Sequence, residues 1–394
     1  MFVNLPTTAT SAYIDWPRRL DAPVVVVGGG QSGLAAAKAL RDMSVPAVIL
    51  EAGDRPAGSW PRYYDSLRAF SPAEFNSMSG VPFPGAPERY PTRDEVADYL
   101  QGYAAWLDAD VQTHTRVQTI RQDGAGFVVH TANGRSLEAS GIVAASGSFA
   151  NPVRPHILGE ETFSGELLHV AGYRNPTAFR GRRVIVVGAG DSAAQVANEL
   201  APVATVSLAA RHPVRFIPQH LAGRDIHYWL RETGFDALPA GWLTKITGGA
   251  VVTDSVGFTQ TLAEGPVDQR PMFVALDGNH VIWPGGQREP VDAIIFATGY
   301  RPSLGYLRGL DALDGDGAPI HDGGISATHL GLVYVGLEHQ RSYASNTLRG
   351  VSEDARAVTA PLAAWIRGAP AAVGLAAAPG SLTTRGVRIA THVS

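Results

Sequence analysis

Two glycine-rich turns, 160 residues apart, constrain this chain more than any other feature of its sequence. Residues 28–33 (GGGQSG) follow the valine run 24–27, and residues 188–193 (GAGDSA) follow the apolar run 184–187. A glycine turn between a buried strand and a helix leaves free backbone N–H groups at the helix N-terminus, where a diphosphate binds. The sequence therefore predicts two nucleotide sites, each in its own strand–turn–helix–strand unit.

The residue 23 positions past the first glycine of each turn differs in charge between the two units. It is Glu51 in the first unit and Arg211 in the second. An acid at this place hydrogen-bonds ribose hydroxyls, whereas a base accommodates a 2′-phosphate. We therefore expect FAD on the first turn and NADPH on the second, as in a flavoprotein that takes hydride from NADPH.

Within the first turn, Gly28 permits the tight bend, Gly30 lets the pyrophosphate approach and Gly33 lets helix and strand pack closely. The other residues that we expect to bind cofactor around the two turns are Gln31, Ser32, Gly188, Gly190, Asp191 and Ser192. The second turn ends in Ala193, which such sites tolerate.

The order of predicted elements indicates an α/β fold with two nested Rossmann-like dinucleotide-binding domains. Residues 1–155 and 290–394 would form the FAD domain, split by an inserted NADPH domain at 156–289. Short alternating strands between 115 and 139 predict a small antiparallel insertion. Residues 220–270 are aromatic and glycine-rich without clear periodicity, and are either a lid, a substrate wall or a helical excursion.

Two helix starts are predicted from capping residues. Thr92 with Glu95 forms a capping box for a helix over 92–107, and Ser352 is the expected N-cap of a helix that ends near residue 367.

Composition narrows the function. The chain has no cysteine, which excludes disulfides, thiolate metal sites and a redox dithiol. Its net charge of −4 gives no basic footprint for nucleic acid. The twelve histidines include no helical pair with a Glu that would indicate a zinc hydrolase, so no metal site is expected.

The N-terminal residues lack a signal-peptide pattern, and no apolar run is long enough to span a bilayer. We therefore expect a cytoplasmic protein without a membrane partner. The oligomeric state stays open, with a homodimer as one candidate.

The segment before the second turn, FSGELLHVAGY at 163–173, matches the pattern F-x-G-x-x-x-H-x-x-x-Y. With the two flanking turns, it resembles the fingerprint of the flavin-containing monooxygenases. Three further segments resemble that family: Gly58-Ser59-Trp60 after the first acid, Ala297-Thr298-Gly299-Tyr300, and Leu348-Arg349-Gly350-Val351, the last typical of its soluble bacterial branch. The resemblance covers roughly residues 23–367.

The resemblance implies that NADPH reduces FAD, that dioxygen then gives a C4a-(hydro)peroxyflavin, and that one oxygen atom passes to nitrogen or sulfur. The substrate would be a small, apolar or aromatic molecule. Tyr173, where Baeyer–Villiger relatives usually carry Trp, favours this heteroatom reaction and is a candidate catalytic residue. His169 is expected to be a positioning residue at the cofactor junction, not a general base. The further cofactor contacts that the resemblance implies are Gly58, Ser59, Trp60, Thr298, Gly299 and Leu348.

One position departs from the family pattern. Phe70 stands where relatives often place an Asn beside the flavin, and Ser71 is the candidate to replace that amide. Uncoupled turnover that releases hydrogen peroxide is therefore an expectation. The alternatives are Baeyer–Villiger oxygenation of a ketone, an NADPH-dependent flavin reductase without oxygen transfer, and a nucleotide-binding sensor.

Overall fold

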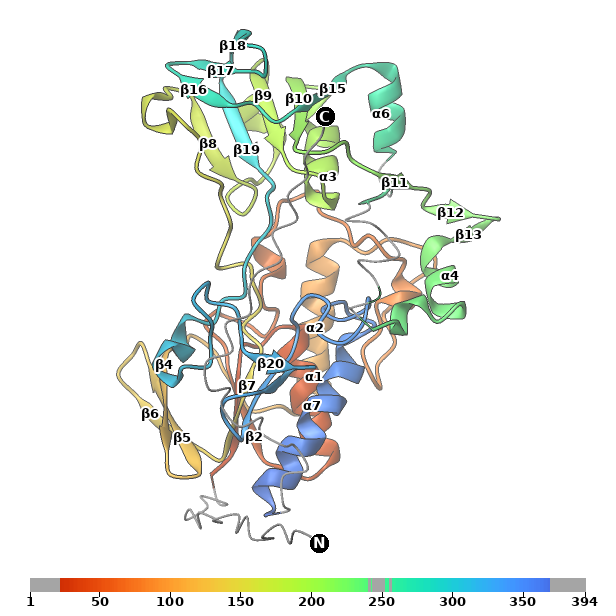
Figure 1. The fold of residues 1–394 in the computed structure, drawn as a ribbon. Helices are drawn as coiled ribbons and strands as arrows, with labels where there is room; N and C mark the ends of the chain where they lie inside the picture. The colour runs from red at the N-terminus through yellow and green to blue at the C-terminus, as the bar shows by residue number, and fades with distance from the viewer. Residues whose placement is uncertain (1–21, 240–241, 243–251, 255–256, 369–394) are drawn as a thin grey trace, which may run out of the picture.

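The computed structural model describes residues 22–239, 242, 252–254 and 257–368, which form two α/β domains stacked end to end (Figure 1). Residues 1–21 and 369–394 lie outside the described part, as do several residues of the 220–270 stretch. Both domains are built on a largely parallel sheet, which confirms the predicted fold class.

The lower domain in Figure 1 contains a seven-stranded sheet in the order β20-β21-β22-β7-β1-β2-β3. Its strands are β1 (Val24–Val27), β2 (Ala47–Leu50), β3 (Val111–Gln112), β7 (Gly141–Ala144), β20 (His321–Asp322), β21 (Ile325–Ser326) and β22 (Leu332–Tyr334). The central four strands, β22, β7, β1 and β2, run parallel. Its main helices are α1 (Gln31–Asp42), α2 (Arg93–Trp106) and α7 (Val351–Ile366).

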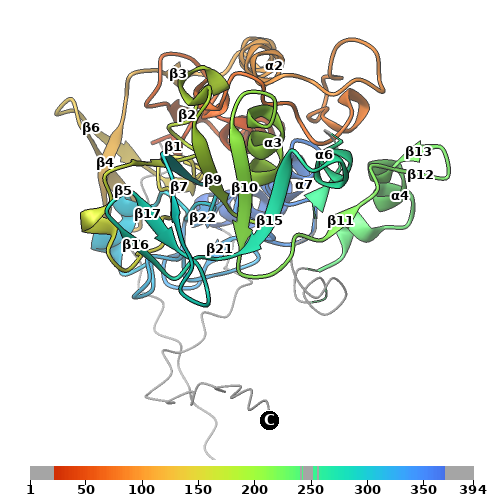
Figure 2. The same ribbon diagram turned by 90° about the horizontal axis from the view of Figure 1, so that it is seen from above.

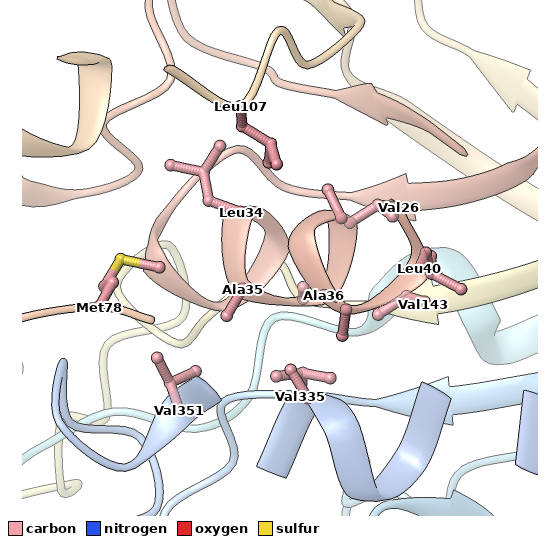
Figure 3. Packing of buried hydrophobic residues seen from close by; sticks show 14 of the residues in the cluster. Val26, Leu34, Ala35, Ala36, Leu40, Met78, Leu107, Val143, Val335 and Val351 are labelled. Atoms are coloured by element: carbon pink, nitrogen blue, oxygen red, sulfur yellow. The ribbon is translucent and has the colours of Figure 1, made fainter. Parts of the chain in front are cut away.

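The four valines of β1 are all buried because each face of the strand has its own cover. Val24 and Val26 pack in the cluster that holds α1 and α7, which Figure 3 shows around Leu34, Ala36 and Val351. Val25 and Val27 pack on the other face, against the antiparallel sheet of β4 (Val117–Asp123), β5 (Gly126–Thr131) and β6 (Ser136–Ala139). Burial on both faces explains why the strand shows no polar alternation.

The upper domain contains a five-stranded sheet in the order β15-β10-β9-β19-β8. Its strands are β8 (Glu166–His169), β9 (Arg183–Val187), β10 (Thr205–Ala210), β15 (Val267–Pro271) and β19 (Ala293–Phe296). Helices α3 (Asp191–Leu200) and α6 (Phe258–Glu264) lie beside β9, β10 and β15 in Figure 2. A small sheet of β16 (Ala275–Asp277), β17 (His280–Ile282) and β18 (Arg288–Pro290) completes the domain.

The pairing of β19 corrects the predicted domain boundary at 289/290. Ala293 lies opposite Val184 of β9 and opposite Glu166 of β8, so this strand belongs to the inserted domain. The chain therefore returns to the first domain after Phe296. Because β19 and the central strands of both sheets are short apolar runs, the sequence of β19 does not indicate which sheet it joins.

Of the two predicted helix starts, one is confirmed and one is wrong. Thr92 and Glu95 form the capping box of α2. Helix α7 begins at Val351 with Gly350 as its N-cap, and the hydroxyl of Ser352 instead accepts a hydrogen bond from the backbone N–H of Ser79. Among the described helices, none combines the length and apolar character needed to cross a membrane.

Candidate active site

The first glycine turn is closed by backbone contacts that exclude side chains. Gly28 has φ of +106°, and a Cβ there would lie 2.6 Å from the carbonyl oxygen of Ala145. A Cβ on Gly33 would lie 1.8 Å from the carbonyl oxygen of Gly28. Helix α1 begins after Gly30 with no side-chain cap and no acid in its first turn, so its N–H groups stay available for phosphate oxygens.

Glu51 lies at the end of β2 and faces this turn, as its spacing predicts. Its Oε2 accepts a 2.6 Å hydrogen bond from the N–H of Gly29, and its Oε1 accepts one of 2.6 Å from Gly53. Each carboxylate oxygen has two lone pairs, so both can accept a further bond from a ribose hydroxyl.

The Gly58-Ser59-Trp60 loop closes over the same turn. A Cβ on Gly58 would lie 2.8 Å from the Cα of Gly30, which explains a glycine at that place. Trp60 donates from Nε1 to Oε1 of Gln31 (2.9 Å), and Gln31 donates from Nε2 to the carbonyl oxygen of Asn346 (2.7 Å). Gln31 therefore ties the loop to the segment before α7.

The second glycine turn is more open. A Cβ on Gly188 would lie 2.4 Å from the carbonyl oxygen of Ala297, but a Cβ on Gly190 would meet nothing within 4 Å. Helix α3 begins at Asp191, whose Oδ1 is buried without a hydrogen-bond partner. Burial raises the pKa of this carboxyl to about 6.

Arg211 follows the last residue of β10 and is exposed. Within the described part of the chain, its guanidinium has no hydrogen-bond or ion-pair partner. The structure thus places it at the strand end where the 2′-phosphate of NADPH is expected.

A cleft of about 760 Å³ lies where the two domains meet. It brings together most of the predicted site residues, which are Gly28, Gly30, Gln31, Ser32, Glu51, Gly58, Ser59, Trp60, Phe70, Ser71, Gly190, Asp191, Ser192, Gly299 and Leu348. The remaining predicted residues, Gly33, His169, Tyr173, Gly188, Arg211 and Thr298, do not line it.

Ser71 lines the cleft but is already engaged, so the structure gives no support for its replacing a missing amide. Its hydroxyl donates to Oδ1 of Asn76 (2.7 Å), and the Asn76 amide donates back to the Ser71 carbonyl (2.8 Å). Ser71 and Asn76 are both buried. Phe70, beside them, is 37 % exposed and presents an apolar surface.

Tyr173 lies away from the cleft, contrary to its prediction as a catalytic residue. Its ring is buried between Tyr64 and Phe179, and its hydroxyl donates to Oε2 of Glu199 (2.9 Å). Burial and the charge of Glu199 raise the pKa of Tyr173. The contacts make it a packing residue under α3, because the hydroxyl is committed to Glu199.

His169, the last residue of β8, links two loops through hydrogen bonds of its imidazole ring. It donates from Nε2 to the carbonyl oxygen of Gly299 (3.1 Å), and its Nδ1 accepts from the N–H of Ala171 (3.1 Å). Burial lowers the pKa of His169, which favours this neutral form. Thr298, in the same loop, donates to the carbonyl oxygen of Val153 (2.5 Å). Both residues therefore shape the cleft without lining it.

A row of four aromatic side chains forms one wall, and only Trp60 among them is a site residue predicted from the sequence. Trp60, Tyr63, Phe149 and Tyr300 all line the cleft, and their neighbouring ring centroids lie 5.8, 4.7 and 5.5 Å apart. They come from three distant segments, so no local pattern links them. Asn346, also missed, lines the cleft with φ of +71°. Asparagine tolerates that conformation, and a Ser-Asn-Thr run before a helix indicates such a turn.

Comparisons with known proteins agree with this geometry. The pyridine nucleotide-disulphide oxidoreductase family matches residues 25–242. An uncharacterized CzcO-like oxidoreductase of Geobacillus kaustophilus is 30 % identical, over 84 % of this chain and 95 % of the relative. The probable indole-3-pyruvate monooxygenase YUCCA9 of Arabidopsis thaliana is 32 % identical over 71 % and 75 %.

Among solved structures, the flavin-containing monooxygenase from Stenotrophomonas maltophilia aligns with a TM-score of 0.78 at 30 % identity. The alignment covers 87 % of this chain and 98 % of that one. The chain therefore belongs to the flavin-containing monooxygenases, a family of FAD- and NADPH-dependent enzymes with the pyridine nucleotide-disulphide oxidoreductase fold.

Proposed function

We propose that this enzyme uses NADPH and dioxygen to transfer one oxygen atom to nitrogen or sulfur of a small apolar or aromatic substrate. The observation that carries the proposal is the single cleft lined by both glycine turns, with Gly28 and Gly30 from one and Gly190 and Ser192 from the other. A flavin and a nicotinamide held on the two turns would face the same space, as hydride transfer requires.

The residues of the first turn fit FAD. The crowding at Gly28, Gly33 and Gly58 leaves a cradle of backbone groups that only glycine can form. Glu51 stands at the place of the ribose hydroxyls, and α1 offers its uncapped N-terminus. When bound, FAD would accept hydride from NADPH and supply the oxygen-transfer chemistry.

The chain itself would orient the substrate and exclude water. The side chains of Trp60, Phe70 and Leu348 form apolar walls of the cleft. The amide group of Asn76 is hydrogen-bonded to Ser71 and is therefore not free to bind a ligand. A partly closed site with apolar walls limits the access of water to the reacting groups.

The aromatic row Trp60–Tyr63–Phe149–Tyr300 favours a planar substrate, because offset and edge-to-face ring contacts add to the apolar burial. Indole-3-pyruvate, named for the YUCCA relatives, belongs in the substrate panel for this reason.

The test is substrate-stimulated NADPH oxidation by the FAD-loaded protein under labelled dioxygen. The panel contains amines, thioethers, indole-3-pyruvate and ketones. We expect one labelled oxygen atom in an N- or S-oxide. An ester from a ketone, or a labelled carboxylic acid formed from indole-3-pyruvate with loss of carbon dioxide, would instead indicate oxygenation at a carbonyl. If peroxide equals the NADPH consumed and no product carries label, oxygen transfer is excluded. Anaerobic turnover with a quinone would then support the reductase alternative.

A further inference from the structure

One segment of the upper domain reaches down onto the lower domain. Residues 216–239, which we call the strap, leave the upper sheet after β10 and lie beside the loops of the lower domain (Figure 1). The strap contains β11 (Phe216–Ile217), β12 (His220–Leu221), β13 (Arg224–Asp225) and α4 (Ile226–Glu232). None of its residues lines the cleft, so within its described residues it is not a substrate wall.

The strap is attached at two places, and the first centres on Asp225. Its Oδ1 accepts from Nδ1 and from the backbone N–H of His227 (2.7 and 2.8 Å). Its Oδ2 accepts from Nε2 of Gln219 (2.7 Å) and from the hydroxyl of Tyr90 in the lower domain. Although burial raises the pKa of Asp225, the hydrogen bonds from His227, Tyr90 and Gln219 lower it to about 2. The carboxylate therefore stays charged and bound.

This first attachment supports the cleft wall at Phe70 from behind. Gln219 also donates to the carbonyl oxygen of Phe70 (3.2 Å), and the His227 ring stacks on the Phe70 ring at 5.7 Å. Arg231 of α4 lies over the neighbouring Phe75, 4.8 Å from its ring centroid. The strap thus contacts both the backbone and the ring of Phe70.

The second attachment is an ion pair between the domains. Arg349 donates from Nε and Nη2 to the two carboxylate oxygens of Asp236, each at 2.8 Å. The side chains are only 11 % and 15 % exposed, so water screens the pair little. The N–H of Ala344 donates to the carbonyl oxygen of Asp236 (3.1 Å), and the Phe235 and Tyr343 rings pack at 5.1 Å.

Arg349 directly follows three cleft-lining residues, Asn346, Thr347 and Leu348, and precedes α7. We propose that both attachments position the walls of the cleft: Asp236 and Arg349 are positioning residues through which the strap of the NADPH domain holds segment 346–348. The first attachment holds Phe70 through Gln219 and His227. The role in catalysis rests on the proposed function. Because sub-ångström placement governs such transfers, loosening the strap should raise the share of NADPH that ends as peroxide.

The test compares Asp236→Asn with a matched control in the FAD-loaded protein. The control is Glu289→Gln, since Glu289 pairs with Arg183 at 2.7 Å with similar exposure (20 % and 15 %) but entirely inside the upper domain. Hydrogen exchange is followed for the backbone amides of residues 342–349. We expect about tenfold faster exchange in Asp236→Asn, as for a broken local contact, and no change there in the control.

The same pair of variants is then assayed for peroxide formed per NADPH oxidised. We expect at least a twofold rise in Asp236→Asn, a wild-type ratio in Glu289→Gln, and equal FAD content in both. Equal exchange at 342–349 in the two variants, or equal peroxide ratios, would overturn the positioning role.

A second variant keeps the proposal testable if Asp236→Asn does not fold. Tyr90→Phe removes only the hydroxyl bound to Asp225 and should speed exchange around Phe70 and Gln219 while raising the peroxide ratio. If neither the exchange rate nor the peroxide ratio changes in Tyr90→Phe, the proposed role of the strap in holding Phe70 is wrong. If the wild type oxygenates no compound of the panel, the proposed function fails, whereas the exchange data still decide whether the strap holds segment 346–348.

Discussion

The two glycine turns begin from similar sequences but differ in how tightly the fold closes around them. At the first turn, Gly33 and Gly58 leave no room for a Cβ, and Glu51 bonds to the backbone of Gly29. At the second, Gly190 has open space around it, and Ala193 stands where the first turn has Gly33. We therefore expect the closed first turn to hold a cofactor that stays bound, and the more open second turn to hold a cosubstrate that exchanges.

The charged residues that follow the two turns differ in the same way. Glu51 is buried and bonded on both oxygens, whereas Arg211 is exposed and, among the described residues, without a partner. A buried, pre-bonded carboxylate is fixed before its ligand arrives, while an exposed arginine is ordered by the ligand, so affinity is expected to be higher at the first turn.

The strongest test of this contrast is to add one methyl group at each turn. In Gly33→Ala, the new Cβ would lie 1.8 Å from the Gly28 carbonyl oxygen, so the turn must open and FAD should be lost almost completely. Gly190→Ala has φ of −110° and free space, and should keep wild-type FAD content. Flavin absorbance per protein, measured after gel filtration, checks both. If the Gly33→Ala protein retains its flavin absorbance, the conclusion that the first turn has no room for a side chain is wrong.

Arg211→Ala tests which nucleotide the second turn selects. Loss of the charge partner of the 2′-phosphate should weaken NADPH by about 1.5–3 kcal/mol, toward the lower end because the site is exposed. NADH lacks that phosphate, so its KM is the internal control and should change little. Steady-state kinetics with both nucleotides measures the difference. An equal loss for NADH would show that Arg211 does not read the phosphate.

Asp191→Asn tests the buried carboxyl at the open turn. Burial raises its folded pKa from 3.8 to about 6, so the folded state binds more protons than the unfolded state between these values. Wild-type stability should therefore fall as pH rises from about 4 to about 6. The Asn variant should lack this fall and be more stable above pH 6, by about 1–2 kcal/mol after allowing for partial exposure.

Denaturant unfolding of the two proteins at pH 4.5 and pH 7.5 measures this effect. The stability difference should be small at the lower pH and fully developed at the higher pH. A difference that does not depend on pH would mean that Asp191 is not titrating in this range.

Tyr173→Phe, in the segment that precedes the second turn, should give the smallest effect. Removing the hydroxyl takes one hydrogen bond from Glu199 and should cost about 1 kcal/mol of unfolding free energy. Product identity and the peroxide ratio should stay at wild-type values, because the ring does not line the cleft. A change in product from N- or S-oxide to ester would restore Tyr173 as a residue that decides the reaction.

The predictions from sequence succeeded where a single local pattern determines the geometry. The glycine spacing predicted that Glu51 faces the first turn, and its carboxylate does accept a hydrogen bond from Gly29, since a βαβ unit fixes the strand end relative to the turn. The predictions failed where another residue, outside the pattern, determines what a side chain contacts. Tyr173 matched a fingerprint whose geometry turns its hydroxyl to Glu199, and Ser71 is occupied by Asn76.

Phe70 is another residue whose contacts the sequence does not reveal. The sequence identified it as a departure from the family pattern, but gave no sign that Gln219 and His227 of the upper domain hold it. Those residues are about 150 positions away in the chain, and no periodicity marks them.

By itself, the sequence determined the two nucleotide-binding units, the opposite charges at 51 and 211, and the absence of a dithiol, because each depends on spacing or composition alone. Only the tertiary structure decided that β19 joins the second sheet, that aromatic rings from three distant segments form one wall, and that Asp236 pairs with Arg349 across the domains. Those outcomes depend on which surfaces meet after folding, and short apolar or charged segments match many partners equally well until the domains pack.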